Sequence, residues 1–186
     1  MGTVRDRVAR RGLALVGDTR PTWVLSTDAD TVVREDWVAQ VLAVAAEHES
    51  ACVVGLVGLD AWHGSPAARR AYRRVLERKL HRGVPGDEHR HVYGANLAVR
   101  ADAYLAVGGY PDAVHGEDQR LVDALDAAGY PIARASGTTV TTSGRTHGRA
   151  AGGRADLLRR LESGPASERL PGLESQDSQD AANVRI

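Results

Sequence analysis

Two aspartates, Asp28 and Asp30, follow the apolar run Trp23-Val24-Leu25 and are separated by a single alanine. Alternate residues of an extended chain point to the same side, so both carboxylates can face one point where the strand ends. Buried carboxylates are costly unless positive charge meets them. Mg²⁺ or Mn²⁺ suits two such oxygen ligands and completes its shell with phosphate oxygens and water. The pair therefore predicts a divalent metal carrying a diphosphate, and the alternative is a polar turn that caps the following helix.

A second acidic motif, Gly116-Glu117-Asp118, opens a segment in which Leu121 and Leu125 lie on one helical face. Acidic residues in a first helical turn are favoured by the helix dipole, so capping is a complete explanation for them. The chemical alternative is a carboxylate at a cleft that accepts a proton from a nucleophile. Such a base must be aimed closely at the hydroxyl that it deprotonates, because a helix N-terminus favours the charged carboxylate.

A third motif, Gly94-Ala95-Asn96, lies between two extended segments. Small residues let a ligand approach the backbone, and the asparagine side chain offers both a donor and an acceptor. The alternative is an ordinary turn. Each of the three motifs is weak by itself, so their order along the chain carries more information than any one of them.

The elements that must position these motifs alternate between strands and helices. Strand, helix and strand over 23–59 indicate an α/β unit with a parallel sheet. Residues 51–59 are continuously apolar, which is typical of a strand covered on both faces. Helices are predicted over 4–15, 34–50, 65–83, 101–109, 116–129 and 154–161, and strands over 23–27, 51–59, a short piece of 91–100, 131–135 and 138–143.

Composition narrows the class of protein. The 24 basic and 24 acidic residues give a formal net charge of zero, which argues against general nucleic-acid binding. Cys52 is the single cysteine, so it excludes an intrachain disulfide and is expected to be a buried, inert thiol. The basic N-terminus has only a short apolar patch and is neither a signal peptide nor a membrane span, so a cytoplasmic location is expected. Residues 163–186 are polar and unpatterned, and we expect a disordered tail after one domain over 1–162.

The segment 65–83 is rich in arginine and carries an apolar stripe at helical spacing. A surface helix packed by that stripe explains the pattern. The alternative is a face that contacts an anionic acceptor or the headgroups at a membrane surface. The stripe consists of Ala68, Tyr72, Val75, Leu76 and Leu80, surrounded by Arg69, Arg70, Arg73, Arg74, Arg78 and Lys79.

The order of the three motifs resembles the family 2 glycosyltransferases with the GT-A fold. STDADT ends a strand, YGANLAVRADAYLAVGGY follows, and GEDQRLVDALDAAGY comes next. VTTSGRTHGRAAGG also looks like the loop after the last strands in a bacterial branch of that family. The resemblance covers roughly Trp23 to Leu161. It implies a Rossmann-like mixed sheet flanked by helices, and an inverting transfer of a sugar from a nucleotide-diphosphate donor to a hydroxyl acceptor.

The resemblance also implies roles for individual residues. Asp28 and Asp30 match the pair that holds a divalent metal and the donor diphosphate, and Asp118 matches the general base, with Glu117 as its neighbour. Gly94, Ala95 and Asn96 match the segment that lines the acceptor side. His147 is a candidate further metal ligand, and Arg145 and Arg149 are candidates to reach phosphate oxygens. A solvated histidine and an exposed basic loop are the alternatives for these last three residues.

The chain departs from the family pattern before Trp23, where nothing matches the strand, loop, helix and second strand that cradle the nucleotide base. We therefore expect a chain that lacks the N-terminal part of the donor-binding half. Its exposed central strand is a candidate edge for self-association. An inactive glycosyltransferase remnant is the corresponding alternative to an active enzyme.

Another class of enzyme also fits one motif. Asp28-Ala29-Asp30-Thr31-Val32 matches the first motif of haloacid-dehalogenase-like phosphatases, in which Asp28 would be the nucleophile. Against this, Ser26-Thr27 interrupt the apolar run that this superfamily needs. Lys79 is also not followed by a convincing acidic motif.

Overall fold

The computed structural model describes residues 2–17, 21–60, 62–80, 91–113, 115–148 and 153–163. The tail predicted from residue 163 lies outside this range except for Ser163. The described residues form two compact units. The larger contains residues of 1–61 and 76–143, and the smaller contains residues of 62–75 and those after 143.

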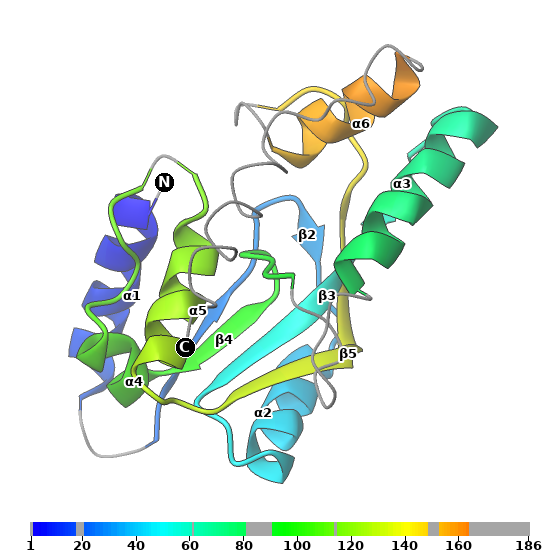
Figure 1. Ribbon diagram of the computed structural model, residues 1–186. Helices are drawn as coiled ribbons and strands as arrows, with labels where there is room; N and C mark the ends of the chain where they lie inside the picture. The colour runs from blue at the N-terminus through cyan, green and yellow to red at the C-terminus, as the bar shows by residue number, and fades with distance from the viewer. Residues whose placement is uncertain are drawn as a thin grey trace, which may run out of the picture. The chain divides into compact units, whose positions relative to one another are not determined.

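A five-stranded mixed sheet forms the centre of the larger unit (Figure 1). Its order is β1, β4, β3, β5, β2, and among the strands of the described residues only β3 and β5 pair in parallel. β4 inserts between β1 and β3 and runs antiparallel to both. β1 and β3 therefore run parallel to each other, as the strand–helix–strand pattern over 23–59 predicts, but they are not neighbours in the sheet. The mixed α/β architecture is confirmed. The strands are β1 (Trp23–Ser26), β2 (Thr31–Val32), β3 (Cys52–Asp60), β4 (Leu97–Arg100) and β5 (Ile132–Ser143).

The helices begin and end close to the residues predicted from periodicity. α2 starts at Trp37 rather than Arg34, because a turn in which the Trp37 N–H donates to the Arg34 carbonyl precedes it. Gly129 follows α5 with a φ of 78°, a conformation that favours glycine after a helix. The helices are α1 (Gly2–Val16), α2 (Trp37–Glu47), α3 (Pro66–Leu80), α4 (Ala101–Ala106), α5 (Glu117–Ala127) and α6 (Arg154–Glu162).

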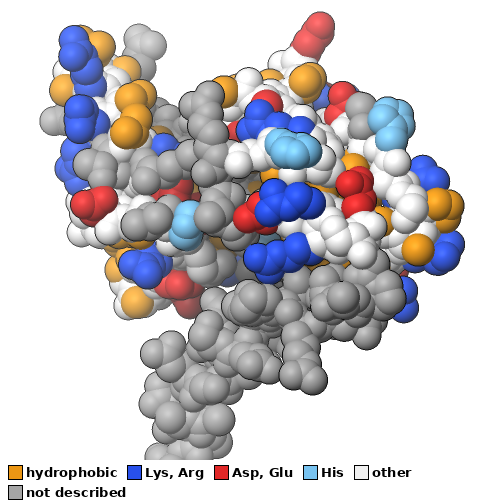
Figure 2. All heavy atoms as spheres, turned by 90° about the horizontal axis from the view of Figure 1, so that it is seen from above, with side chains coloured by type: hydrophobic (Ala, Val, Ile, Leu, Met, Phe, Trp, Pro, Cys, Tyr) orange, Lys and Arg blue, Asp and Glu red, His pale blue; other side chains and the backbone are white. Residues whose placement is uncertain are grey.

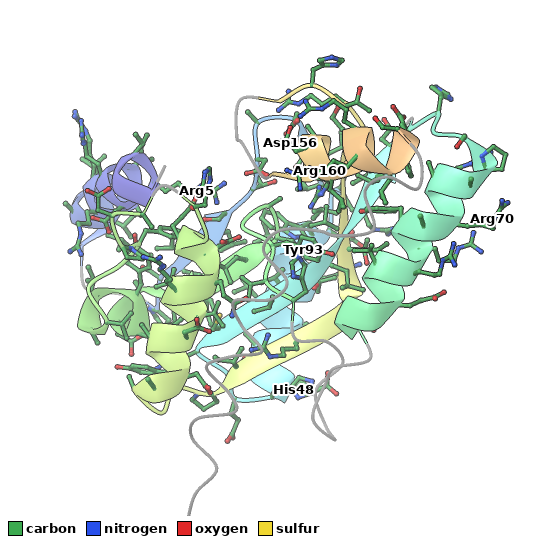
Figure 3. The ribbon with its side chains drawn as sticks, turned by 45° about the horizontal axis from the view of Figure 1, so that its top comes forward. Arg5, His48, Arg70, Tyr93, Asp156 and Arg160 are labelled. Carbon is green, nitrogen blue, oxygen red and sulfur yellow. The ribbon has the colours of Figure 1, made fainter. Side chains whose placement is uncertain are left out.

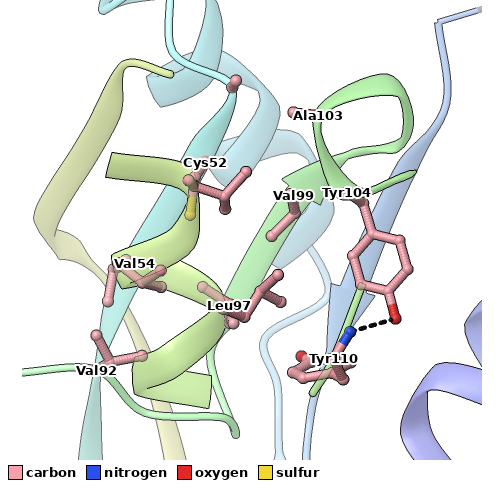
Figure 4. Packing of buried hydrophobic residues seen from close by; sticks show 12 residues of the cluster. Cys52, Val54, Val92, Leu97, Val99, Ala103, Tyr104 and Tyr110 are labelled. Carbon is pink, nitrogen blue, oxygen red and sulfur yellow. Dashed lines mark hydrogen bonds between the residues drawn. The ribbon is translucent and has the colours of Figure 1, made fainter. Parts of the chain in front are cut away.

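β3 is buried on both faces, which explains its continuous apolar sequence. Cys52 and Val54 face the layer that contains α4 and α5 (Figure 4), whereas Val53 and Val57 face α2. Cys52 is completely buried, and burial raises the pKa of its thiol to about 12. The prediction of a buried, inert thiol is confirmed.

β5 joins two segments that were predicted as separate strands. Ala135 pairs with Gly55, and the next pair along the ladder is Leu56 with Thr139, so residues 136–138 form a bulge. Because the bulge contains Ser136-Gly137, its sequence resembles that of a loop. In the structure, however, pairing with β3 resumes after the bulge. A bulge bends its strand locally while pairing continues on both sides.

The smaller unit is strongly basic among its described residues, with eight arginines against two carboxylates. Trp62 donates from Nε1 to Glu162 of α6 and packs edge-on against Tyr72 of α3. Ala68 and Val75 are buried, which confirms a packed stripe on α3, and Arg70 points outward from the helix (Figure 3). Contact of this face with an anionic acceptor or with headgroups stays a prediction. None of the described helices has both the length and the apolar character needed to cross a membrane.

Candidate functional site

The two aspartates of the first motif lie in a tight turn after β1. The Thr31 N–H donates to the Asp28 carbonyl at 3.0 Å, and the Asp30 carbonyl accepts from the Ser143 N–H of β5. The turn thus connects β1 to β2 and is bound to the end of β5. Both aspartate side chains are partly exposed, as a ligand-binding role requires.

Arg5 of α1 supplies the positive charge that meets Asp28. Its Nη2 lies 2.5 Å from Asp28 Oδ1, and its Nη1 donates to the Gly94 carbonyl at 2.9 Å. Its Nε lies 3.9 Å from Glu117 Oε1. Burial opposes the charged guanidinium, but Asp28, Tyr110 and Glu117 more than offset this and the pKa of Arg5 is raised. One side chain therefore contacts the turn after β1, the 94–96 motif and the start of α5. Figure 3 shows Arg5 between α1 and α5.

Asp118 meets the same motif from α5. Its Oδ2 accepts a hydrogen bond from the Gly94 N–H at 2.7 Å, and its Oδ1 accepts from the Gln119 N–H at 3.0 Å. Each carboxylate oxygen has a second lone pair, so the group can still accept a proton. Glu117 beside it is buried, with its side chain 10% exposed.

Gly94 is the point at which these groups converge, and its lack of a side chain makes the convergence possible. A Cβ at this position would lie 2.7 Å from Arg5 Nη1 and 3.1 Å from Asp118 Oδ2. The first contact is shorter than Cβ atoms show in packed proteins and the second is tight, so a side chain here would push Arg5 and Asp118 away. The motif was expected to bring a ligand close to the backbone, and here it brings two charged side chains there.

Asn96 has every side-chain polar group engaged inside the fold. Its Oδ1 accepts from Trp37 Nε1 at 3.0 Å, and its Nδ2 donates to the carbonyls of Leu56 and Thr138. The residue is 1% exposed. These bonds give Asn96 a structural role between α2, β3 and β5. The role of Gly94, Ala95 and Asn96 in lining an acceptor stays a prediction.

Two tyrosines support α1 against this site. Tyr110 shares a hydrogen bond with Ser26 at the end of β1, and its ring centroid lies 6.0 Å from the Arg5 guanidinium carbon. Burial is the main reason why the pKa of Tyr110 is raised. Tyr104 donates to Asp6 of α1 and accepts from the Tyr110 N–H (Figure 4). Arg5 is therefore held in place by a helix that is itself tied to the core.

The described residues do not fit a metal site formed by the protein alone. No group of three or more histidine, cysteine, aspartate or glutamate side chains that could hold a metal is found in the described part of the chain. A guanidinium already neutralises Asp28. His147 and Arg145 are exposed in the smaller unit, and Arg149 lies outside the described residues. The metal and phosphate roles of these residues stay predictions.

The structure thus brings Asp28, Gly94, Glu117 and Asp118 together, and it adds Arg5, which the sequence motifs do not reveal. The available signal for Arg5 is its phase on α1. It lies one helical turn before Ala9, which packs on the core together with Leu13. No family model matches the chain, and no curated protein matches it.

Proposed function

We propose that residues 1–162 form the catalytic region of a glycosyltransferase of the family 2 type, which transfers a sugar from a nucleotide-diphosphate donor to a hydroxyl acceptor with inversion. The observation that carries the proposal is the convergence on Arg5 and Gly94. Three motifs that are far apart in the sequence supply their acidic or glycine residues to one place. If Asp118 only capped α5, it would bind amides of its own helix. It also binds the Gly94 N–H, which is more than twenty residues away in the sequence.

Asp118 is the general base of this proposal. Its carboxylate takes the proton of the acceptor hydroxyl while that oxygen attacks the anomeric carbon. The bond from the anomeric carbon to the diphosphate oxygen breaks, and the diphosphate leaves with the electron pair. The bond from the Gly94 N–H fixes the orientation of Asp118, which a base at a helix N-terminus requires.

Arg5 and Asp28 form the donor-binding side of the proposed active site. The guanidinium still has N–H groups beyond those that contact Asp28 and Gly94, and such groups bind phosphate oxygens well. Binding of Mg²⁺ or Mn²⁺ at Asp28 and Asp30 remains part of the prediction. No step is assigned to that metal, because the described carboxylates do not form a metal-holding group.

The test is release of nucleoside diphosphate from UDP-, GDP- and TDP-sugars in the presence of glycerol as a hydroxyl acceptor, with and without Mn²⁺. We expect release with one donor, and Asp118→Asn should lower it by about 100-fold or more, the contribution typical of a general base. Asp126→Asn is the matched control, because Asp126 is exposed on the same helix. Equal activity of the Asp118 variant and the wild-type chain would exclude the proposed base.

A further inference from the structure

β1 ends the sheet, and one of its two edges has no strand beside it among the described residues. The Ala101 N–H donates to the Thr22 carbonyl, which places the main-chain groups of Thr22, and then of Val24 and Ser26, toward β4. The main-chain groups of Trp23 and Leu25 therefore point to the open side. A row of such groups is a template for another strand.

An apolar stripe on α1 is exposed at the same end of the sheet. Val4, Val8 and Leu15 are 64%, 67% and 83% exposed, and they share the helical face opposite Asp6 and Leu13, which contact the core. Arg7 and Arg11 are exposed beside them. Figure 2 shows hydrophobic and arginine side chains together on the left of the molecule, over α1. These apolar residues recur at helical spacing on one face, unlike apolar residues scattered singly over a surface. No described residue covers them.

The other layer of the sheet is also open beside β1. A shallow, open groove of about 410 Å³ lies between the strand and α2. The Ser50 hydroxyl in its lining is buried without a hydrogen-bond partner among the described residues. Trp23, Leu42, Ala45, Ala46, Glu49, Ser50 and Arg100 line this groove.

We propose that this end of the molecule is a docking surface for a β-strand of a different polypeptide, which pairs with β1 and has carboxylates next to the strand. The main-chain groups of Trp23 and Leu25 supply the strand pairing. The groove accepts an apolar side chain of the added strand, and the α1 stripe packs against apolar residues that flank it. Arg7 and Arg11 attract the carboxylates that lie next to the added strand. The proposal does not depend on the glycosyltransferase assignment.

Charge decides between a different polypeptide and a second copy of this chain. Two copies paired through β1 about a two-fold axis would place helices of the same layer next to each other. Arg7 and Arg11 of one copy would then approach the same arginines of the other, and no exposed carboxylate of the stripe offsets them. Like charges at an interface cost affinity, so the second copy is disfavoured.

The experiment titrates the full-length, isotope-labelled chain with a synthetic peptide of alternating valine and threonine that has glutamates at both ends. Amide shifts are followed by nuclear magnetic resonance. We expect shifts confined to 22–26, to α1 and to the residues that line the groove. A matched peptide with lysines in place of the glutamates should bind at least about tenfold more weakly, which corresponds to about 1.4 kcal/mol. Absence of shifts at 22–26 with the glutamate peptide would overturn the proposal.

Two controls separate strand pairing from loose contact. A glutamate peptide with N-methylated alternate amides cannot pair and should cause no shifts, whereas equal binding would refute strand addition. The Arg7→Glu/Arg11→Glu variant should reverse the preference between the two charged peptides, and an unchanged preference would refute the acidic flank. Sedimentation of the chain alone should give a monomer. A dimer that Leu25→Pro dissociates would assign the edge to a second copy and contradict the proposal.

Discussion

At the scale of single residues, the site depends on charges that come from distant parts of the chain. Asp28, Glu117 and Asp118 would repel one another without the Arg5 guanidinium between them. The sequence motifs predict the carboxylates, because acidic pairs after a strand and at a helix start are recognisable locally. They do not predict Arg5, because α1 carries several arginines and only the packing of the helix shows which of them faces the sheet.

Arg5→Met should destabilise the fold, because it leaves Asp28 and the Gly94 carbonyl without their partner. Asp28 is 40% exposed, so its ion pair contributes less than a fully buried one. In a double-mutant cycle of Arg5→Met with Asp28→Asn, measured by urea unfolding, we expect a coupling free energy of about 1 kcal/mol. Simple additivity of the two changes would show that the ion pair does not contribute to stability.

Asn96 and Ser50 form a contrasting pair of buried polar residues. Asn96→Leu removes the partners of Trp37 Nε1 and of two carbonyls, so we expect a loss of about 3 kcal/mol in the free energy of unfolding. Ser50→Ala removes a hydroxyl that has no partner among the described residues, and it should be neutral or stabilise by up to about 1 kcal/mol. Equal losses in urea unfolding of the two variants would contradict these assignments.

At the scale of elements, hydrophobic periodicity is sufficient to place the helices and most strands. It does not reveal which strands pair, because pairing depends on segments far apart in the chain. β4 illustrates this, since its four residues contain no signal that they separate β1 from β3. β5 illustrates the other limit, because a bulge at Ser136-Gly137 has the composition of a turn.

α1 should contribute to stability through one side only. Leu13 packs on the core, whereas Leu15 is 83% exposed. Leu13→Ala should therefore cost about 1–2 kcal/mol, less than a fully buried leucine, and Leu15→Ala should change the free energy of unfolding by less than about 0.5 kcal/mol. If Leu15→Ala cost as much as Leu13→Ala in urea unfolding, the orientation of α1 would be wrong.

At the scale of the whole molecule, burial of Cys52 couples folding to alkaline pH. Its thiol has a pKa of about 12 in the fold against a reference value of 9.0, so the folded chain retains a proton that the unfolded chain loses. The free energy of unfolding should therefore fall as pH rises above about 9, by up to about 1.4 kcal/mol for each pH unit. Below that pH this contribution is fully present.

The Cys52→Ala variant provides the check. Its free energy of unfolding should depend less steeply on pH between about 9 and about 10, a range in which tyrosines of the unfolded chain are mostly still protonated. Urea unfolding across this range measures the difference in slope, which is independent of any cavity left by the substitution. Identical slopes for the variant and the wild-type chain would contradict the effect of burial on this thiol.

The central claim is that the convergence of Arg5, Asp28 and Gly94 binds a nucleoside diphosphate. The most direct measurement is the melting temperature of the chain with UDP, GDP or TDP, each with and without Mn²⁺, beside Asp28→Asn and Asp30→Ala variants. A ligand that binds the folded state must raise the melting temperature. We expect a rise with one nucleotide, which the Asp28→Asn variant loses. No rise with any nucleotide, in a chain that still melts cooperatively, would contradict it.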